Sequence, residues 1–255
     1  MKNFIYGMVV VGAMAGAVTL CAQTAGSAQK PETAQKAESL PTADEIVAKY
    51  VAAIGGKDAI GKVKSVSIEN TATMMGGENP STTTIVDGVG YKNETDFNGT
   101  KIVQCYTDKG GWSINPYAGA ATATPMPDDV YNGGKSQIFV GGALYDYAAR
   151  GGKVELLGKD GGAYKIKLTT KENVEAVYFI DATTYLITTV TSKGKMQDQD
   201  VDITTRFSDY RKTDLGYTIP YAIDLDFGGQ FELTIAVKKV ELNKTIDPAI
   251  FAMPK

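Results

Sequence analysis

A regular alternation of hydrophobic and polar residues begins at about residue 66 and recurs in short runs along the rest of the chain. Val66, Ile68 and Ala72 mark the first run, and such alternation is typical of a β-strand with one buried face. Two later runs are joined by Asn98-Gly99, the pair preferred in tight hairpin turns. Together the runs predict roughly ten or eleven antiparallel strands with short turns, in a large sheet or a barrel. The other runs are 82–86, 91–97, 101–106, 112–114, 154–157, 164–168, 174–180, 185–191, 201–207, 217–227 and 231–240.

A helical period replaces the alternation in one segment before the first strand. Ile46 and Tyr50 fall on one face at helical spacing, as in an amphipathic helix that packs on a sheet. Thr42 and Glu45 have the spacing of a capping box at its start, and a pair of glycines after residue 54 marks its end. A second helical turn is expected at 58–63, just before the first strand.

The alternation also stops between residues 115 and 150. Three prolines and a run of Ala, Gly and Thr over 115–132 predict a long loop. The spacing of hydrophobic residues over 135–150 predicts another helix, although Gly141-Gly142 would weaken it by about 1 kcal/mol per glycine.

The first residues follow the pattern of a cleavable export signal. Lys2 supplies a positive charge, and Phe4–Leu20 is a nearly uncharged apolar run that ends at small residues. We expect cleavage after Ala22, with cleavage after Ala28 as the alternative. Lipidation of Cys21 is the rival interpretation.

This pattern divides the chain into three parts. Residues 1–22 are the expected signal peptide. Residues 23–40, rich in Ala, Gln, Thr, Lys and Glu and without aromatic residues, are expected to form a flexible tether. Residues 41–255 are expected to form a single β-rich domain that works outside the cytoplasm.

The absence of histidine from the whole chain restricts the chemistry that is open to it. It excludes serine–histidine and cysteine–histidine catalysis and histidine-bearing zinc sites. A formal net charge of −3 and the lack of a basic stripe argue against nucleic acid as a partner. Once the signal is removed only Cys105 remains, so no internal disulfide can form, and we expect this thiol to be buried. No metal or cofactor is expected.

Three groups of acidic residues could still supply chemistry: a pair at 128–129, a triplet at 198, 200 and 202, and a pair at 224 and 226. We interpret the first pair as a stabilised helix start. The triplet lacks the glycine turn and closing glutamate of a calcium loop, so we interpret it as a solvated hairpin end. The last pair lies on one face of a strand, as paired glycosidase carboxylates could, but without an evident partner acid. The groups are Asp128 with Asp129, then Asp198, Asp200 and Asp202, and finally Asp224 with Asp226.

Four short segments form a further pattern. They are an opening helix (43–56), a strand–Asp–turn–strand unit (178–186), a late strand pair (207–211 with 216–220) and a closing segment (243–254). Together they resemble the LolA/LolB-like superfamily of periplasmic lipid and lipoprotein carriers, in particular the Bacteroidetes-type outer-membrane lipoprotein-sorting-like proteins. The resemblance implies a mainly β, α+β fold: an incomplete antiparallel β-barrel around short helices, with an apolar cavity for acyl chains and no catalytic residues.

Hydrophobic side chains around the irregular region are the candidate lining of such a cavity, since ligand sites favour aromatic and apolar walls. The same residues could equally be ordinary core, because core and cavity share walls in this fold. The candidates are Met74, Trp112, Ile114, Tyr117, Met126, Ile138, Phe139, Leu144 and Tyr145.

We therefore expect a non-enzymatic periplasmic carrier that binds a lipid or an acylated, lipoprotein-type cargo as a monomer. Its expected partners are this cargo, envelope donor and acceptor proteins and, transiently, the membrane. The alternative is a non-catalytic protein-interaction or sensor module of the cell envelope that uses the same concave surface, and the third hypothesis is a carboxylate-based hydrolase. A dry apolar cavity would favour the carrier, whereas a filled cavity with an exposed apolar edge would favour the interaction module.

Overall fold

The computed structural model describes residues 40–196 and 199–254. The expected signal peptide, the expected tether up to residue 39 and Asp198 lie outside the described residues. The helical elements are α1 (Ala43–Ala53), α2 (Gly56–Lys62), η1 (Pro116–Ala118), α3 (Asp128–Gly134), η2 (Lys135–Ile138) and η3 (Pro248–Phe251).

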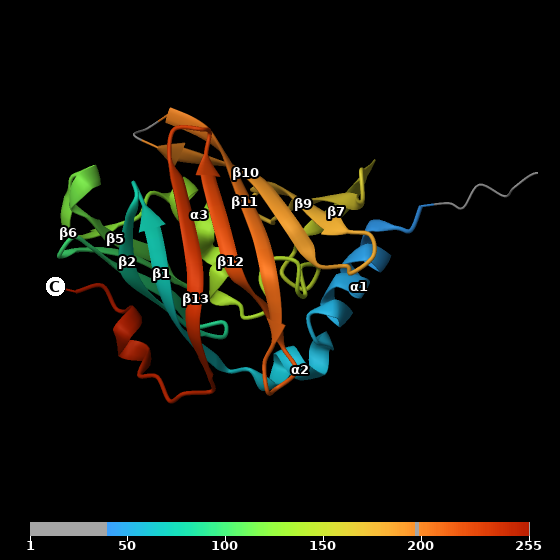
Figure 1. Cartoon of the computed structure of the whole chain (residues 1–255), viewed down its shortest axis with the longest axis horizontal. Coiled ribbons are helices and arrows are strands. Elements are labelled where there is room, and N and C mark those ends of the chain that lie inside the picture. The colour runs from blue at the N-terminus through green and yellow to red at the C-terminus, as the bar shows by residue number, and fades with distance from the viewer. Residues whose placement is uncertain (1–39, 197–198, 255) are drawn as a thin grey trace, which may run out of the picture. The chain divides into compact units, whose positions relative to one another are not determined.

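The described residues form one sheet of thirteen antiparallel strands, in the order β6-β5-β4-β3-β2-β1-β13-β12-β11-β10-β9-β8-β7. Apart from β6 and β7, strands that are consecutive in the chain are neighbours in the sheet, and β1 pairs with β13 in its middle (Figure 1). Strands β6 and β7 form the two edges, so the sheet stays open. The strands are β1 (Ser65–Met74), β2 (Gly77–Val86), β3 (Gly90–Phe97), β4 (Thr100–Thr107), β5 (Gly111–Asn115), β6 (Ala120–Pro125), β7 (Lys153–Asp160), β8 (Ala163–Thr169), β9 (Glu175–Asp181), β10 (Ile187–Met196), β11 (Gln199–Lys212), β12 (Thr218–Phe227) and β13 (Glu232–Leu242).

The predicted fold class is confirmed, with more strands in the described residues than the ten or eleven expected. The strand that none of the alternating runs predicted is β6, which lies within the segment 115–132 that was expected to be a loop. Its Ala and Thr residues give no alternation of hydrophobic and polar positions, and it pairs with β5 at only three positions. Alternation cannot reveal a strand of this kind. Helix α3 also begins inside this segment, with Asp128 and Asp129 in its first turn as expected.

The helix expected over 135–150 is wrong beyond residue 138. Only the turn η2 forms there, and the chain then continues as an irregular segment, 139–152, which we call the inner loop. Gly142 and Asp146 have φ angles of 73° and 50°. These left-handed conformations are incompatible with a continuous right-handed helix.

Helix α1 begins at the capping box that the sequence predicts. Glu45 N–H donates to Thr42 Oγ1 (3.2 Å), and Thr42 N–H donates to Glu45 Oε2 (2.8 Å). The helix buries Ile46, which belongs to one large hydrophobic cluster with Leu144 of the inner loop and Ile166 of β8. We call the sheet face that packs on α1 and the inner loop the inner face, and the opposite face the outer face.

A second, smaller hydrophobic cluster lies on the outer face, under the C-terminal segment. Phe251 of η3 packs there against Cys105 and Trp112, and the Trp112 indole N–H donates to the Phe251 carbonyl oxygen (2.8 Å). Cys105 is buried, as predicted. The end of the chain is therefore fixed to the sheet by one aromatic side chain and by hydrogen bonds to its backbone.

The contact between Phe251 and Gly90 provides a test of this packing. A Cβ atom at Gly90 would lie 2.5 Å from the Phe251 ring, whereas one at Gly61 in α2 would meet nothing within 4 Å. We expect Gly90→Ala to destabilise the protein by about 1–3 kcal/mol through overpacking. Gly61→Ala should stabilise it by about 0.5–1 kcal/mol through helix propensity. Urea unfolding measures both, and equal stabilities would contradict the assigned position of Phe251.

The Cys105 thiol provides a second test. Burial raises its pKa to about 12, and only the thiolate reacts with alkylating reagents. In the variant Cys21→Ser, whose only thiol is Cys105, we expect iodoacetamide to modify the native protein at neutral pH about a hundredfold or more slowly than the urea-unfolded protein. Mass spectrometry follows the modification. Similar rates in the two states would show that Cys105 is accessible.

Candidate functional site

The structure separates the nine residues predicted to line one cavity. Trp112 pairs across the sheet with Cys105, so it lies on the outer face under Phe251, and Ile114 packs against the same cluster. Tyr117 is 61% exposed and contacts the Phe97 ring edge-on at 5.3 Å. The Met126 sulfur lies beside Gly111.

Four of the other predicted residues come from η2 and the inner loop. Ile138 and Leu144 are buried, and Leu144 belongs to the main core. Phe139 lies under the Arg150 guanidinium, 4.1 Å from its carbon atom to the ring centroid, and Tyr145 packs over Gly141. Leu144 and Tyr145 pack in or against the main core that α1 covers, whereas Ile138 and Phe139 lie beside Gly88, just after β2. Met74, at the end of β1, is partly buried and belongs to neither core cluster.

Met74 is one of a group of hydrophobic side chains that continue across the inner face beyond the core. The strand register places Met74 opposite Leu233, Leu233 opposite Leu225, and Phe227 opposite Ile203. Residues directly opposite each other point to the same face. We call this group the apolar strip. Its members are Met74, Ile203, Ile223, Leu225, Phe227, Leu233, Ile235 and Val237.

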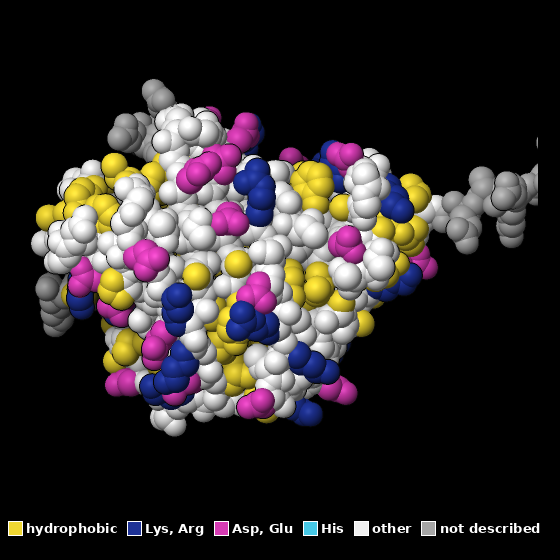
Figure 2. Space-filling model, viewed as in Figure 1, with side chains coloured by type: hydrophobic (Ala, Val, Ile, Leu, Met, Phe, Trp, Pro, Cys, Tyr) yellow, Lys and Arg dark blue, Asp and Glu magenta, His cyan; other side chains and the backbone are white. Residues whose placement is uncertain are grey.

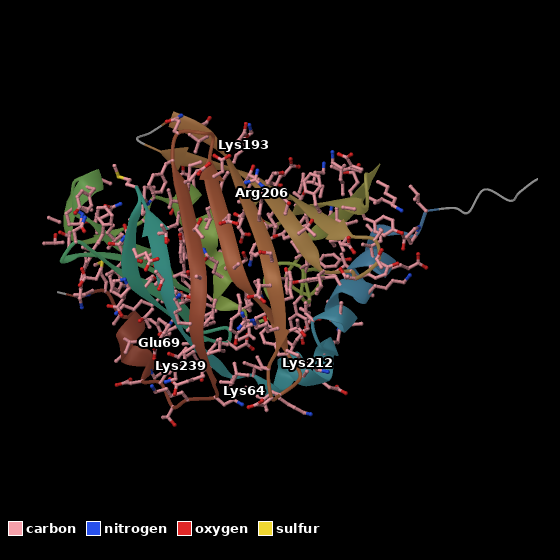
Figure 3. All side chains as sticks on the ribbon, in the orientation of Figure 1. Lys64, Glu69, Lys193, Arg206, Lys212 and Lys239 are labelled. Carbon is pink, nitrogen blue, oxygen red and sulfur yellow. The ribbon has the colours of Figure 1, made fainter. Side chains whose placement is uncertain are left out.

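The apolar strip is only partly covered. Each of its eight side chains is of intermediate exposure, and none is part of either described core cluster. The opposite side of the same strands is polar: Glu69, Arg206 and Lys239 lie on the outer face (Figure 3). Figure 2 shows both signs of charge mixed over that face. A row of half-exposed aliphatic and aromatic side chains on one face of a sheet is the kind of surface that marks a binding site.

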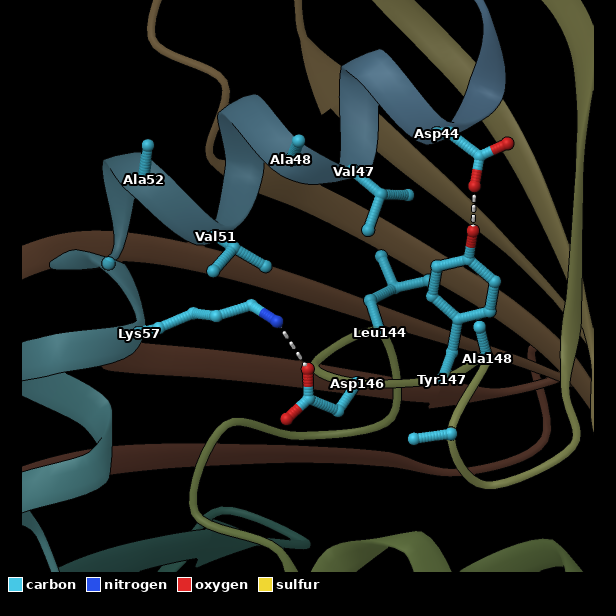
Figure 4. A pocket seen from close by; sticks show the side chains of 12 residues that line it. Asp44, Val47, Ala48, Val51, Ala52, Lys57, Leu144, Asp146, Tyr147 and Ala148 are labelled. Atoms are coloured by element: carbon cyan, nitrogen blue, oxygen red, sulfur yellow. Dashed lines mark hydrogen bonds and ion pairs between the residues drawn. The ribbon is translucent and has the colours of Figure 1, made fainter.

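Beside the core, a groove of about 550 Å³ runs between α1 and the inner loop (Figure 4). Its walls are largely aliphatic, with Val47 and Val51 on one side and Leu144 on the other. Two polar contacts bridge it. Lys57 Nζ pairs with Asp146 Oδ1 at 2.9 Å, and the Tyr147 hydroxyl donates to Asp44.

The second of these contacts persists over a wide pH range. Burial, and then the hydrogen bond to Asp44, raise the pKa of Tyr147 to about 12. The phenol therefore stays protonated and can donate at any physiological pH. A second groove of about 500 Å³ lies on the opposite side of the sheet, along Trp112 and Phe251.

The acidic groups do not converge. Asp224 accepts a hydrogen bond from the Thr234 hydroxyl (2.8 Å), and Asp226 accepts one from the Gly229 N–H (2.6 Å), so both are used within the sheet. Asp202 pairs with Lys193 at 2.5 Å. In the described part of the chain, no three His, Cys, Asp or Glu side chains come together as metal ligands would. No helix within the described ranges is long and apolar enough to cross a membrane.

No family model matches the sequence, and no curated protein matches it significantly. Solved structures do match it in three dimensions. A LolA superfamily protein from Nitrosomonas europaea has a TM-score of 0.54 at 12% identity, over 84% of this chain and 98% of that chain. A DUF1329 family protein from Desulfovibrio piger has a TM-score of 0.55 at 14% identity, over 82% and 97%.

The fold is that of the LolA superfamily. A domain of a candidate outer membrane lipoprotein-sorting protein from Vibrio parahaemolyticus also shares it, with a TM-score of 0.51 at 12% identity over 81% of this chain and 94% of that chain. The resemblance inferred from the four sequence segments is thus confirmed at the level of the fold.

Within this LolA-like half-barrel, Arg150 organises the inner loop. Its Nη2 donates to the backbone carbonyls of Gly142 (2.9 Å), Ala143 (2.8 Å) and Tyr145. Burial lowers the pKa of the guanidinium from its ordinary value. An irregular segment inside a core must find partners for its carbonyl groups, and one arginine supplies them here. Sequence reasoning missed this role, because the three carbonyls carry no side-chain signal.

Replacing Arg150 should therefore weaken the LolA-like core. We expect Arg150→Met to destabilise the protein by about 1–3 kcal/mol, because it leaves carbonyl oxygens without a donor. Lys57→Met is the matched control: its ion pair has side chains 73% and 41% exposed, and such surface pairs contribute about 0–1 kcal/mol. Urea unfolding gives the stabilities, and hydrogen exchange should show faster exchange within 139–152 only for the Arg150 variant. A larger loss for Lys57→Met would contradict this account.

Proposed function

We propose that this protein is a non-enzymatic periplasmic carrier that holds a lipid or an acylated, lipoprotein-type cargo on the inner face of its half-barrel. The observation that supports this most directly is the apolar strip. It offers contiguous hydrocarbon surface on the sheet face where the LolA-like fold also holds its helix and inner loop. The export pattern in the sequence and the fold of the neighbours support the periplasmic location.

The strip is suited to an alkyl chain. Ile223 and Ile235 pair directly across two strands, and so do Leu225 and Leu233, which gives a surface of branched side chains two strands wide. Each methylene removed from water contributes about 0.8 kcal/mol. Part of this gain is offset by the loss of translational freedom and chain entropy on binding.

The groove under α1 offers a second contact for such a chain. Val47, Val51 and Leu144 line it. The Lys57–Asp146 ion pair across it joins exposed side chains, and such pairs contribute little to stability. A chain that extended from the strip toward α1 would replace water along these residues without disturbing the buried core.

The protein-interaction module is a second candidate because side chains of η2 and of the inner loop already fill space where a cavity was expected. Leu144 is only 1% exposed and Ile138 only 4%. A filled interior with a half-exposed apolar strip also suits a protein partner laid across the inner face. The two candidates differ in whether free amphiphiles bind.

Two neighbouring residues of β13 give a matched test. Ile235 lies in the apolar strip, while Ala236 points to the outer face opposite Ala222. We expect Ile235→Lys to reduce binding of a fluorescent fatty acid by at least about tenfold, because the ammonium would lie where the alkyl chain binds. Ala236→Lys should leave binding unchanged.

Circular dichroism and urea unfolding show whether each variant folds, and Ile235→Ser serves as the milder replacement if the lysine variant does not. Equal binding by the Ile235 and Ala236 variants would exclude the strip as the site. Native mass spectrometry of protein purified from the periplasm should in addition show a bound acyl species. A ligand-free mass that stays unchanged when lipids are offered would favour the protein-interaction module.

A further inference from the structure

The inner face contains a second distinct surface, next to the apolar strip. Six uncharged polar side chains lie on β1–β4, and the strand register places them opposite one another. Asn70 is opposite Ser81, which is opposite Thr95 on its other side. Asn93 is opposite Thr83 on one side and opposite Gln104 on the other. We call them the polar patch. Its members are Asn70, Ser81, Thr83, Asn93, Thr95 and Gln104.

Hydrogen bonds join most of the patch into one network. Asn93 Nδ2 donates to the hydroxyl oxygens of Ser81 (3.1 Å) and Thr83 (3.0 Å). Asn70 Nδ2 also donates to the Thr83 hydroxyl (3.2 Å), and the Thr95 hydroxyl donates to Ser81 (3.0 Å). The network fixes these amides and hydroxyls in place.

The patch becomes more exposed from the middle of the sheet toward β4. Asn70, Ser81 and Thr83 are buried, Asn93 and Thr95 are partly buried, and Gln104 is exposed. Buried polar groups are normally hydrogen-bonded to partners within the protein. This network instead continues to side chains that a ligand can reach.

The patch and the strip meet along β1. Asn70 is opposite Ser81 on one side and opposite Val237 of the strip on the other, and Ala72 next to it is opposite Ile235. One continuous face is therefore hydrogen-bonding on β1–β4 and apolar on β11–β13. The described side chains of the strip and the patch include no Lys, Arg, Asp or Glu. The charges of these strands, such as Glu69, Lys239 and Asp224, are on the outer face.

This arrangement leads to the proposal, which rests on the carrier function above. We propose that the inner face binds an amphiphile whose head group is uncharged and rich in hydroxyl groups, such as an acylglycerol or a glycosylated lipid. The alkyl chain would lie on the apolar strip and the head group on the polar patch, at Asn93, Thr95 and Gln104.

The absence of charged side chains from the polar patch should make the inner face select between head groups according to their charge. A carboxylate or phosphate head group placed on the patch would lose hydration without gaining a cationic partner, and desolvating an unpaired charge is costly. A hydroxyl group can both donate and accept, so it exchanges its bonds with water for bonds to amides and hydroxyls at little cost. The preference should therefore be for neutral head groups over both anionic and cationic ones.

Three ligands with one alkyl chain test this preference. They are monolauroylglycerol, laurate and lauryltrimethylammonium, each used below the concentration at which it forms micelles. Displacement of a fluorescent alkyl probe from the exported protein gives their affinities. We expect monolauroylglycerol to bind at least about tenfold more tightly than either charged ligand.

Substitutions in the polar patch test whether the head group binds there. Thr95→Val and Gln104→Leu remove a hydroxyl and an amide from the reachable part of the patch, and we expect each to reduce the preference for monolauroylglycerol by about threefold or more. Thr82→Val makes the same change as Thr95→Val on an exposed, outer-face position of β2 and should have no effect. Gln104 is exposed, so its variant tests the patch even if Thr95→Val does not fold.

The outcomes separate this inference from the function on which it rests. Equal affinities for the three ligands, or tighter binding of a charged one, would overturn the neutral head-group preference and leave the carrier proposal standing. A preference that the patch variants do not change would also overturn the inference, because the selectivity would then arise elsewhere. Failure of every amphiphile to bind would overturn both proposals.

Discussion

The pairing of β1 with β13 is the contact on which the rest of this structure depends. Every other strand pair joins neighbours in sequence through a short connection, whereas this pair brings Val66 opposite Leu242. Closing such a long loop carries an entropic cost that local hairpins do not have. The pairing joins two meanders, β1–β6 and β7–β13, into one face. Without it the polar patch and the apolar strip would belong to separate surfaces, and no amphiphilic face would exist.

The inner loop determines which apolar surface stays accessible on the inner face. An irregular segment in a core is tolerated only when its backbone groups find partners, and Arg150 provides three hydrogen bonds for this purpose. Leu144 can then enter the core and fill space near α1. The accessible apolar surface is consequently displaced to the strip and to the shallow groove beside Val47 and Val51. The same half-barrel thus combines a filled core with a partly exposed apolar strip.

The two faces of the sheet have opposite character for separate physical reasons. On the outer face, Glu69, Lys239 and other charged side chains interact with water and with one another, and the small cluster under Phe251 fixes the C-terminal segment. On the inner face, charges are absent from the strip and the patch. Alternation along each strand makes this division possible, because neighbouring residues such as Ile235 and Ala236 point to opposite faces.

The sequence by itself determined the fold class and most of the elements, although not β6 or the irregular inner loop. The capping box of Thr42 and Glu45, the Asn98-Gly99 turn and the alternating runs are local signals, so their structures could be predicted, and the absence of histidine excluded whole classes of chemistry. Only the tertiary structure decided which residues share a surface. Trp112 and Leu144 both belong to hydrophobic segments, yet the register places Trp112 on the outer face and Leu144 in the inner core. Strand alternation gives two faces but does not say which is inside, because that depends on pairing between strands and on what packs against them.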